Sequence, residues 1–491
     1  MKVLIANPPA YMGDHKRHFI QAGSRWAFSM FVPKNSKEHY LPYPFGLGYS
    51  SAILKENKDC NVEGFDACAL DLDSQEFVRK VESQHPDVLF MDVPTISFPL
   101  VMDMLKVLKD SVNCKIVLSG GHVTALADNV MNNYPQVDYC VLGEYEFTLK
   151  KLVDQFINKE NDLKKIEGLA FRRSGKTIVN QPVPQTFNLD TLPYPDRDDF
   201  PVDHYHDFEI AGRPCVQMLT TRGCPYDCSF CMTIRVLYCD SHNYRKREPD
   251  KIVDEMEQVR DKYGAKQIYF DDDTFAVDRK RLNRICEEII SRKFDVPWTA
   301  MGDITLDDET LNNVSRAGCV GIKFGVETVN PAVLKGIGKT FINQEKIKNF
   351  VKSCRNFGIW SHATYIVGLP EERRDDIEKT IESAKELDTD SVQFAIATPF
   401  PGTPFYEKAK AQGWLVTNDW TRYDGANYSV VSYPWLSNTE IEELHKKALK
   451  KWYKNTLRKE LLHWNRTRLL IKAGSVRYAT RKVLSHLNGR L

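Results

Sequence analysis

The 491-residue sequence contains no uninterrupted apolar run of about 18 residues, the length that a membrane-spanning helix needs. Its start, Met1–Asn7, lacks the long apolar segment of a signal peptide and is typical of a short buried strand. Neither sign of charge dominates, since 67 basic residues face 66 acidic ones. We therefore expect a cytoplasmic protein, and its length predicts two or three domains.

Cysteine is not abundant either, with twelve residues in the whole chain. Because no export signal is present, a reducing compartment is expected, which disfavours disulfide bonds. Most of the cysteines lie in apolar strands or on predicted helix faces, where we expect small core residues. These are Cys60, Cys68, Cys114, Cys140, Cys215, Cys286, Cys319 and Cys354.

The exception is a stretch in which three cysteines follow the spacing Cys-x-x-x-Cys-x-x-Cys, directly after the apolar run Val216–Leu219. They are Cys224, Cys228 and Cys231. Thiolates bind iron and zinc, and this short spacing lets one loop bring all three to one metal centre. Three ligands for four irons would leave one iron open to a small molecule. A structural zinc site is the alternative, with Cys239 or His242 as fourth ligand.

Charge is unevenly distributed along the chain. Residues 446–491 contain fourteen basic residues and one acidic residue, Glu460, whereas the other 445 residues carry a net charge of −12. Such a tail favours an anionic partner, and its apolar residues at helical spacing are typical of a helix on an anionic membrane. The alternative is a helical region that caps the acidic body. The first apolar face consists of Ile441, Leu444, Ala448, Trp452 and Tyr453.

The first 160 residues alternate strand and helix signals. Five strands are predicted, at Val3–Ala6, Val62–Phe65, Val88–Met91, Ile116–Ser119 and Tyr139–Leu142. The helical patterns between them predict an α/β fold, a doubly wound parallel sheet of Rossmann-like type. Ligands bind beyond the carboxyl ends of such strands, where glycines allow close approach and hydroxyl groups form hydrogen bonds. The residues there are Thr95, Ser97, Ser119, Gly120, Gly121, His122, Gly143 and Glu144. A domain that binds nothing is the alternative.

A connector follows, with a hairpin signal over residues 166–180 and five prolines between Pro182 and Pro201. From Arg213 a second α/β pattern begins. Its six strands are predicted at Val216–Leu219, Gln267–Phe270, Trp298–Met301, Val320–Val326, His362–Val367 and Val392–Ala397. Six βα units predict a partial (β/α)6 barrel of the TIM type, with its chemistry at the C-terminal strand ends. The cysteine loop follows the first of these strands.

The cysteine spacing, with an aromatic residue before the third cysteine, resembles the signature of radical S-adenosylmethionine (SAM) enzymes. The segments Tyr269–Asp273, Gly321–Glu327, Ile366–Pro370 and Pro399–Pro404 resemble later motifs of that family. The resemblance implies that the three cysteines hold a [4Fe–4S] cluster, that SAM binds its open iron, and that SAM is cleaved to a 5′-deoxyadenosyl radical. It assigns SAM contacts to Phe230, Asp271, Asp272, Asp273, Gly325, Glu327, Gly368 and Pro370.

The acidic run among these SAM contacts has alternatives of its own. Asp271–Asp273 could also be a solvated strand end or a site for a divalent cation. Its place at the mouth of the predicted barrel favours the contact with SAM.

The N-terminal motifs Ile5–Pro9, Pro44–Tyr49, Ser119–His122 and Gly143–Glu146 are similar to the cobalamin-binding domain of class B radical SAM enzymes, such as anaerobic Mg-protoporphyrin cyclase and hopanoid methylases. The resemblance implies that the strand-end residues of the first sheet bind cobalamin. The motif Asp-x-His-x-x-Gly, whose histidine ligates cobalt in methionine-synthase-type domains, is missing. We therefore expect cobalamin without a histidine on its lower face.

The resemblance implies a cobalamin-dependent C-methyltransferase that acts on an unactivated carbon. One SAM would methylate the cobalamin, and a second would provide the radical that removes hydrogen from the substrate. No catalytic residue of the protein itself is assigned. One alternative is a cyclase or carbon–carbon coupling enzyme of the same family, acting on a lipid or tetrapyrrole without methyl transfer. The other is a corrinoid or cluster sensor without turnover.

We expect four parts: a cobalamin-binding-like domain at 1–160, a hairpin and proline-rich linker at 161–205, the radical SAM barrel at 206–405, and a helical basic region at 406–491. The expected partners are a small-molecule or lipid substrate and an electron donor such as flavodoxin or ferredoxin; nucleic acid is not expected. The basic region adds a peripheral contact with the inner face of the membrane.

Overall fold

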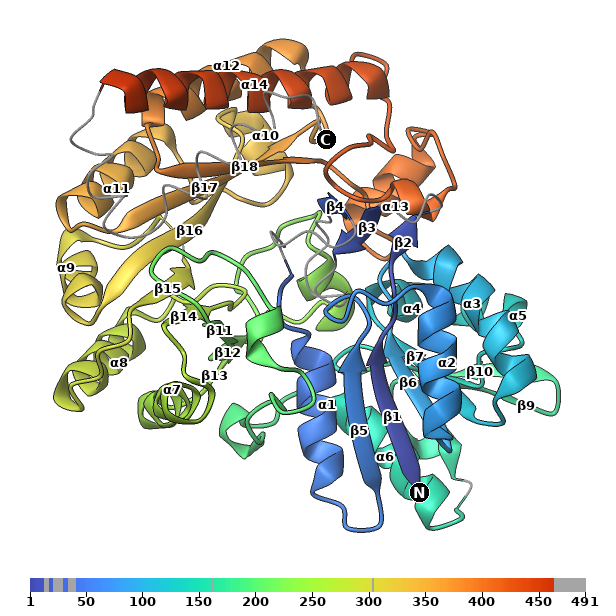
Figure 1. The fold of residues 1–491 in the computed structure, drawn as a ribbon. Coiled ribbons are helices and arrows are strands. Elements are labelled where there is room, and N and C mark those ends of the chain that lie inside the picture. The colour runs from blue at the N-terminus through green and yellow to red at the C-terminus, as the bar shows by residue number, and fades with distance from the viewer. Residues whose placement is uncertain (13–16, 21–29, 34–40, 161, 303, 463–491) are drawn as a thin grey trace.

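The computed structural model describes residues 1–12, 17–20, 30–33, 41–160, 162–302 and 304–462. Within them, two predominantly parallel sheets lie side by side, each with its own helices (Figure 1). The first sheet lies at the lower right of Figure 1, and the second forms the left and upper part. A short antiparallel sheet of β2 (Tyr11–Met12), β3 (Arg17–Ile20) and β4 (Met30–Pro33) lies near the place where they meet.

The first sheet confirms all five strands predicted for the N-terminal region. Its parallel strands follow the order β5-β1-β6-β7-β8, in which the direction of winding changes between β1 and β6. Ligands of doubly wound sheets bind at such a switch point. The bounds are β1 Lys2–Asn7, β5 Asn61–Asp66, β6 Val88–Asp92, β7 Lys115–Ser119 and β8 Tyr139–Val141.

Helices cover both faces of this sheet, because alternate strand residues point to opposite sides. Strand residues such as Val3 and Phe90 pack with helices α1 (Phe45–Lys55) and α6 (Glu146–Ile157). Their neighbours Leu4 and Leu89 pack on the other face. The helices there are α2 (Ser74–Gln84), α3 (Phe98–Ser111) and α5 (Ala127–Asn133), with the short α4 (Gly121–Ala125) before α5.

The hairpin that the sequence placed in the connector belongs to the first sheet. Strand β9 (Leu169–Arg173) pairs antiparallel with β8, and β10 (Lys176–Val179) forms the sheet edge. Leu169 and Phe171 join the core on one face of the sheet, whereas Ala170 joins the core on the other. Leu169–Phe171 are therefore buried between the two helix layers, whereas the edge strand β10 is only half-buried. The 3-10 turns Leu163–Lys165, Leu189–Thr191 and Val202–His204 flank this part of the chain.

The second sheet confirms the six strands of the predicted partial barrel. All are parallel and in sequence order: β11 Cys215–Met218, β14 Gln267–Phe270, β15 Trp298–Met301, β16 Cys319–Glu327, β17 Trp360–Val367 and β18 Ser391–Ile396. One apolar core joins them to the helices packed outside. These are α7 Pro249–Tyr263, α8 Arg279–Ser291, α9 Asp308–Arg316, α10 Pro331–Gly336, α11 Gln344–Asn356 and α12 Arg374–Leu387.

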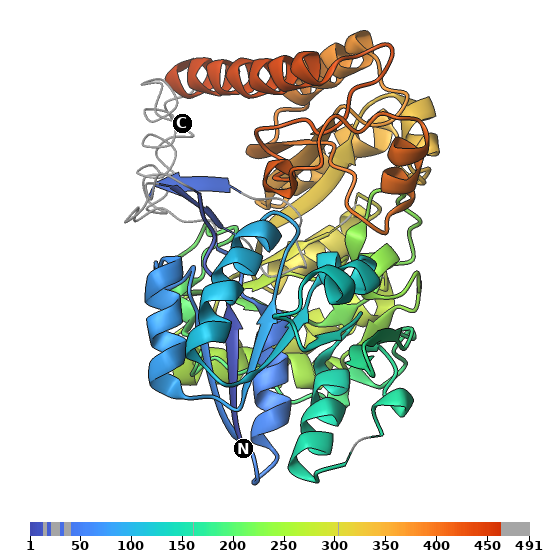
Figure 2. The same cartoon turned by 90° about the vertical axis from the view of Figure 1, so that its right-hand side faces the viewer.

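The C-terminal region caps the barrel. After α13 (Pro404–Ala411) and the 3-10 turn Trp420–Arg422, helix α14 (Asn438–Leu462) runs along the end of the molecule opposite the N-terminus (Figure 2). The apolar face predicted for this helix is buried against α12 and β18, with Ile441 and Ala448 fully covered. The capping alternative therefore holds for residues 441–453, and this face is not available to a membrane. Residues 463–491 lie outside the described ranges.

No helix among the described residues is both long and apolar enough to cross a lipid bilayer.

Candidate functional site

The three cysteines lie on the loop that follows the first barrel strand, as predicted. Residues Thr221–Arg222 form the short strand β12, which pairs antiparallel with β13 (Arg245–Lys246). Gly223 then turns with φ of +101°, and a β-carbon there would lie 2.2 Å from the carbonyl oxygen of Asn243. Only glycine fits such a turn. The cysteines that follow are half-buried, and a π-helical turn, η4 (Thr233–Leu237), comes directly after them.

Two carboxylates at the end of β14 hold the start of this loop. Asp272, fully buried, accepts hydrogen bonds from the backbone N–H of Thr220 at 2.8 Å and of Thr221 at 2.5 Å, and from both threonine hydroxyls. Asp273 accepts from the N–H of Gly223 at 3.0 Å and from the hydroxyl of Tyr238 at 2.9 Å. The acidic run thus anchors the cysteine loop, and its contact with SAM stays a prediction.

Two of the three thiols, Cys224 and Cys231, pack against the apolar cluster of Ile234, Leu237 and Tyr238. Burial raises the pKa of Cys228 to about 12, against the lowering effect of the Lys339 ammonium, and burial raises the pKa of Cys231 as well. A bound metal reverses this preference, because its charge deprotonates a coordinating thiol. Within the described ranges, no three His, Cys, Asp or Glu side chains converge on a point that one metal ion could occupy. A cluster does not need such a point, because its thiolates bind different irons.

The predicted SAM residues on β16 face the cysteine loop. Glu327 ends the strand with φ of +63°, and its carboxylate pairs with Lys339. The segment before Lys339 lies against the loop, since the N–H of Ser229 donates to the carbonyl of Ile337 at 3.0 Å. The structure thus brings Gly325, Glu327 and the cysteines to one end of the barrel. Phe230 packs partly against the barrel core.

The predicted residues after β17 are covered by the C-terminal region. Gly368 has φ of +85°, and a β-carbon there would lie 2.8 Å from the side chain of Ile441 in α14. Its carbonyl accepts the hydroxyl of Tyr433 at 2.8 Å, and its N–H donates to Glu372 at 2.9 Å. Pro370 is half-buried beside it. These contacts shape the strand end, and the adenine-side role of both residues stays a prediction.

The predicted cobalamin residues gather at the carboxyl ends of β6 and β7. Thr95, Ser97 and Ser119 are buried there, and the hydroxyl of Ser119 donates to the carbonyl of Val141 at 2.6 Å. The His122 ring packs between Phe98, with centroids 4.2 Å apart, and Trp420 of the C-terminal region at 5.0 Å. Burial lowers the pKa of His122 to about 3, so the ring is neutral.

Two of these side chains carry buried polar atoms that a ligand could bind. In the described part of the chain, Oγ1 of Thr95 and Nδ1 of His122 are buried without a hydrogen-bond partner. Buried polar groups in proteins are nearly always paired, so both atoms point to a ligand with hydrogen-bonding groups. The amides and hydroxyls of a corrin nucleotide supply such groups. The residues present therefore fit cobalamin at this edge, as the three thiols fit a cluster.

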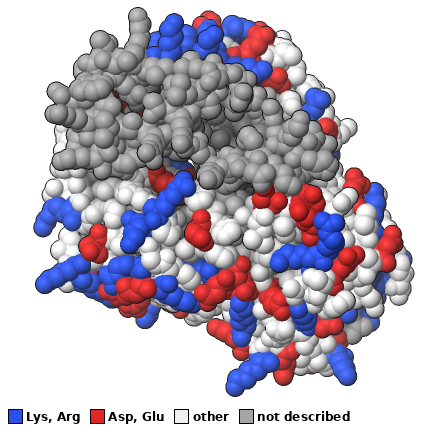
Figure 3. Space-filling view, viewed as in Figure 1, with Lys and Arg blue, Asp and Glu red and all other residues white. Residues whose placement is uncertain are grey.

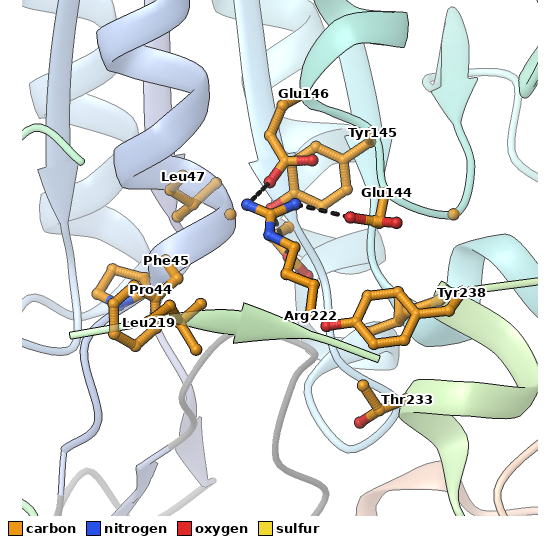
Figure 4. Close-up of a pocket in the computed structure, with 14 residues that line it drawn as sticks. Pro44, Phe45, Leu47, Glu144, Tyr145, Glu146, Leu219, Arg222, Thr233 and Tyr238 are labelled. Atoms are coloured by element: carbon orange, nitrogen blue, oxygen red, sulfur yellow. Dashed lines mark hydrogen bonds and ion pairs between the residues drawn. The ribbon is translucent and has the colours of Figure 1, made fainter. Parts of the chain in front are cut away.

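Gly143 and Glu144 line a cavity where the two sheets meet (Figure 4). Its other walls are the start of α1, the end of β6, Arg222 and the η4 turn. The cavity measures about 70 Å³, enough for a few water molecules and far less than a corrin ring. The cavity is therefore a small gap at the junction of the two sheets, and this junction is called the seam below. In Figure 4 the Arg222 guanidinium lies between the carboxylates of Glu144 and Glu146.

Sequence reasoning missed this contact. The sequence patterns assign no role to Arg222, and they include Glu146 only as the last residue of the motif Gly143–Glu146. A signal was available, because an arginine two residues before a predicted metal loop and two glutamates at a strand end carry opposite charges. No pattern in the sequence says that they meet, since 76 positions separate Arg222 from Glu146.

Comparison with known proteins supports the assignment of both the N-terminal domain and the barrel domain. The model of the B12 binding domain matches residues 37–153, and that of the radical SAM superfamily matches residues 218–384. An uncharacterized methyltransferase of Pyrococcus horikoshii is 32% identical over 412 residues, covering 84% of this chain and 87% of the relative. The anaerobic magnesium-protoporphyrin IX monomethyl ester cyclase of Cereibacter sphaeroides is 27% identical over 389 residues, 78% of this chain and 62% of the relative.

A solved structure shares the fold. The radical SAM methyltransferase TsrM from Kitasatospora setae, determined with cobalamin and a [4Fe–4S] cluster bound, superposes with a TM-score of 0.64. The match covers 84% of this chain and 75% of TsrM at 18% sequence identity. Given the extent of the Pyrococcus match and the two domain matches, the chain belongs to the radical SAM superfamily and carries a B12-binding domain before its radical SAM domain.

Proposed function

We propose that this radical SAM enzyme is a cobalamin-dependent C-methyltransferase that moves a methyl group from SAM to an unactivated carbon of its substrate. Its family gives it a [4Fe–4S] cluster, SAM and cobalamin as cofactors. When bound, these supply a carbon-centred radical and a transferable methyl group. The protein's own contribution is to hold, orient and shield the reactants.

One observation carries the proposal: the cysteine loop is bonded directly to the strand-end loop of the first sheet. Arg222, two residues before Cys224, donates a hydrogen bond to Glu144 at 2.9 Å. The residues predicted to hold the two cofactors therefore belong to facing edges of the two sheets. A reaction that uses both cofactors on one substrate requires this arrangement. The methyltransferase name of the Pyrococcus relative supports the same reading.

In this proposal Cys224, Cys228 and Cys231 ligate the cluster. The SAM contacts are Phe230, Asp271, Asp272, Asp273, Gly325, Glu327, Gly368 and Pro370. The cobalamin contacts are Thr95, Ser97, Ser119, Gly120, Gly121, His122, Gly143 and Glu144. The cobalamin domain spans residues 1–160 together with the β9–β10 hairpin, and the barrel spans residues 206–405.

Enzymes of this superfamily need a reductant and act on small molecules, and we propose a flavodoxin or ferredoxin as the donor. We also propose a cytoplasmic enzyme whose basic end contacts an anionic membrane surface. The described surface in Figure 3 carries intermingled acidic and basic side chains, whereas residues 463–491 contain seven basic residues and no acidic one. A chain ending at Leu462 keeps α14 and its packing, so it should lose binding to anionic vesicles without loss of folding; unchanged binding would refute the contact.

The second candidate is a cyclase of the same family, which the 27% identity to the Cereibacter cyclase favours. An anaerobic assay with SAM labelled in its methyl group, a strong reductant and a small-molecule extract of the host cells separates the two. The methyltransferase gives a product that carries the label and requires cobalamin. A SAM-dependent product without label would replace the proposal with cyclisation or coupling.

A further inference from the structure

Four charged side chains, two from each domain, form ion pairs at the seam between the two sheets. The Arg222 guanidinium donates to Oε1 of Glu144 at 2.9 Å through Nη1 and pairs with Oε1 of Glu146 at 2.8 Å through Nη2. The other oxygen of Glu144 accepts from Nη2 of Arg245. All four residues are at least nine-tenths buried. Two positive and two negative groups balance, as a buried network requires.

The barrel side of this network comes from one strand pair. Arg222 and Arg245 are directly opposite each other in the β12–β13 ladder. Like charges at such a position repel, so the pair is unfavourable unless carboxylates lie against it. Glu144 supplies one oxygen to each arginine. The barrel therefore presents an arginine pair that needs the first sheet for its neutralisation.

The sheet side of the network is continuous with the cobalamin residues. Glu144 follows Gly143 in the turn after β8, and Glu146 begins α6, where the helix dipole favours a negative charge. Between them, Tyr145 donates its hydroxyl to Asp92 at the end of β6, at 2.7 Å. The turn is thus bonded both to the end of β6 and to Arg222, so a shift of the turn would move both.

Successive residues before the first cysteine are tied to different domains. Thr221 and Gly223 are bonded to the carboxylates at the end of β14, whereas Arg222 is bonded to the first sheet. The Arg222 guanidinium also lies over the ring of Tyr49 in α1, 4.9 Å from its centroid. The planar fork of an arginine fixes direction as well as distance, because each Nη has its own carboxylate.

We propose that the Glu144–Arg222–Glu146–Arg245 network is a positioning device that sets the separation between the cluster and the cobalamin. It acts through the loop and does not touch the reacting atoms, so Arg222, Arg245 and Glu146 are positioning residues, and Glu144 is in addition a proposed cobalamin contact. The inference rests on the cofactors of the proposed function but not on methyl transfer itself. Its failure would leave the methyltransferase proposal standing, and a failure of methyl transfer would not affect it.

The test measures the separation directly. Reduced [4Fe–4S] and cob(II)alamin each carry an unpaired electron, so pulsed electron paramagnetic resonance of the anaerobically loaded protein reports the distance between them. Arg222→Lys keeps the charge but loses the fork, and we expect the distance distribution to become about twofold broader or to shift. The contents of iron and cobalamin should stay at the wild-type level. Equal distributions in variant and wild type would overturn the proposal.

The control is Arg197→Lys. Arg197 is also a buried arginine bonded to a carboxylate, since its Nη2 donates to Glu255 at 2.7 Å and to the carbonyl of Gln217 at 3.0 Å. Among the described residues, the hydrogen bonds of Arg197 go to Glu255 and Gln217 and not to the cysteine loop, so the separation should not change even if the protein is destabilised. If Arg222→Lys fails to hold the cluster, Glu146→Gln decides by the same criterion, because it removes one arm of the network on the side of the first sheet. A change of distance in the Arg197 variant equal to that in the network variants would also overturn the proposal.

Discussion

Gly121 lies directly against Met232: a β-carbon on Gly121 would be 2.5 Å from Sδ of Met232. The glycine belongs to the Gly-Gly pair after β7, and the methionine follows the third cysteine. Because Gly121 has no side chain, Met232 from the cysteine loop can pack directly against its backbone. This contact is a second tie between the first sheet and the cluster region, beside the Arg222 network.

A methyl group at position 121 should overpack this contact. We expect Gly121→Ala to lower the free energy of unfolding by about 1–3 kcal/mol, and to cost much less in a Met232→Ala background. Denaturant unfolding of the four proteins of this cycle measures the coupling. Gly336→Ala, with no atom within 4 Å of the added carbon, is the control and should be near neutral. An equal cost in both backgrounds would contradict the contact.

Each of the three loop cysteines should be needed for the cluster. Replacing Cys224, Cys228 or Cys231 by alanine is expected to abolish cluster absorption and SAM cleavage after anaerobic reconstitution, because the remaining thiolates cannot hold four irons. Cys239→Ala is the matched control, since Cys239, like His242, is a candidate for the fourth ligand of a zinc site. Retained iron and SAM cleavage in the Cys239 variant are predicted. Stoichiometric zinc in the wild-type protein would refute the cluster.

Asp272 should stabilise the cysteine loop through its hydrogen bonds to Thr220 and Thr221. Asp272→Asn replaces one of two accepting oxygens by a donor that faces the threonines, and we expect a loss of about 2–4 kcal/mol in unfolding free energy together with a lower iron content. Asp307→Asn makes the same chemical change at an exposed helix cap, and it should lower the unfolding free energy by only about a few tenths of a kcal/mol. Equal effects of the two substitutions would argue against the anchoring role.

The carboxyl of Glu372 gives a pH dependence with a defined sign. Burial raises its pKa to about 7, although the N–H groups of Gly368 and Leu369 lower it. The stability that the protonated Glu372 carboxyl contributes is fully present below the pKa that this group has in the unfolded chain. It is lost as the pH rises through the folded-state pKa of about 7. Between pH 5 and pH 8 this loss is about 2–3 kcal/mol.

Glu372→Gln should remove that dependence while keeping an acceptor for both N–H groups. The difference in unfolding free energy between wild type and variant, followed from about pH 5 to pH 8, isolates this group from all others. Wild type should lose stability relative to the variant as pH rises. A constant difference over this range would mean that Glu372 is already ionised at low pH.

The succession of strands and helices along the chain could be predicted from the sequence because apolar runs of strand length alternate with helical patterns. Every predicted strand of both sheets is present, Val88–Met91 and Gln267–Phe270 among them. The hairpin at residues 169–179 was misplaced, because its pairing partner β8 is chosen by tertiary packing and not by its own pattern. The apolar face of α14 had two readings for the same reason: periodicity shows a buried face but not what covers it.

The site was predictable where one segment carries it. Cys224, Cys228 and Cys231 share a loop, so their spacing was enough. Asp272 was found as part of a polar strand end, yet its hydrogen bonds to Thr220 and Thr221 depend on how β11 and β14 lie side by side. The meeting of Arg222 with Glu144 depends on the docking of two sheets, which no local pattern contains.

The most direct measurement of the central claim is the fate of SAM on the loaded enzyme. A methyltransferase of the proposed kind uses SAM twice, as methyl donor and as radical source. Anaerobically reconstituted protein with cobalamin, reductant and substrate extract should therefore form S-adenosylhomocysteine and 5′-deoxyadenosine together, and cobalamin-free protein should lose the first. Formation of 5′-deoxyadenosine alone, with cobalamin bound and no S-adenosylhomocysteine, would contradict the proposed function.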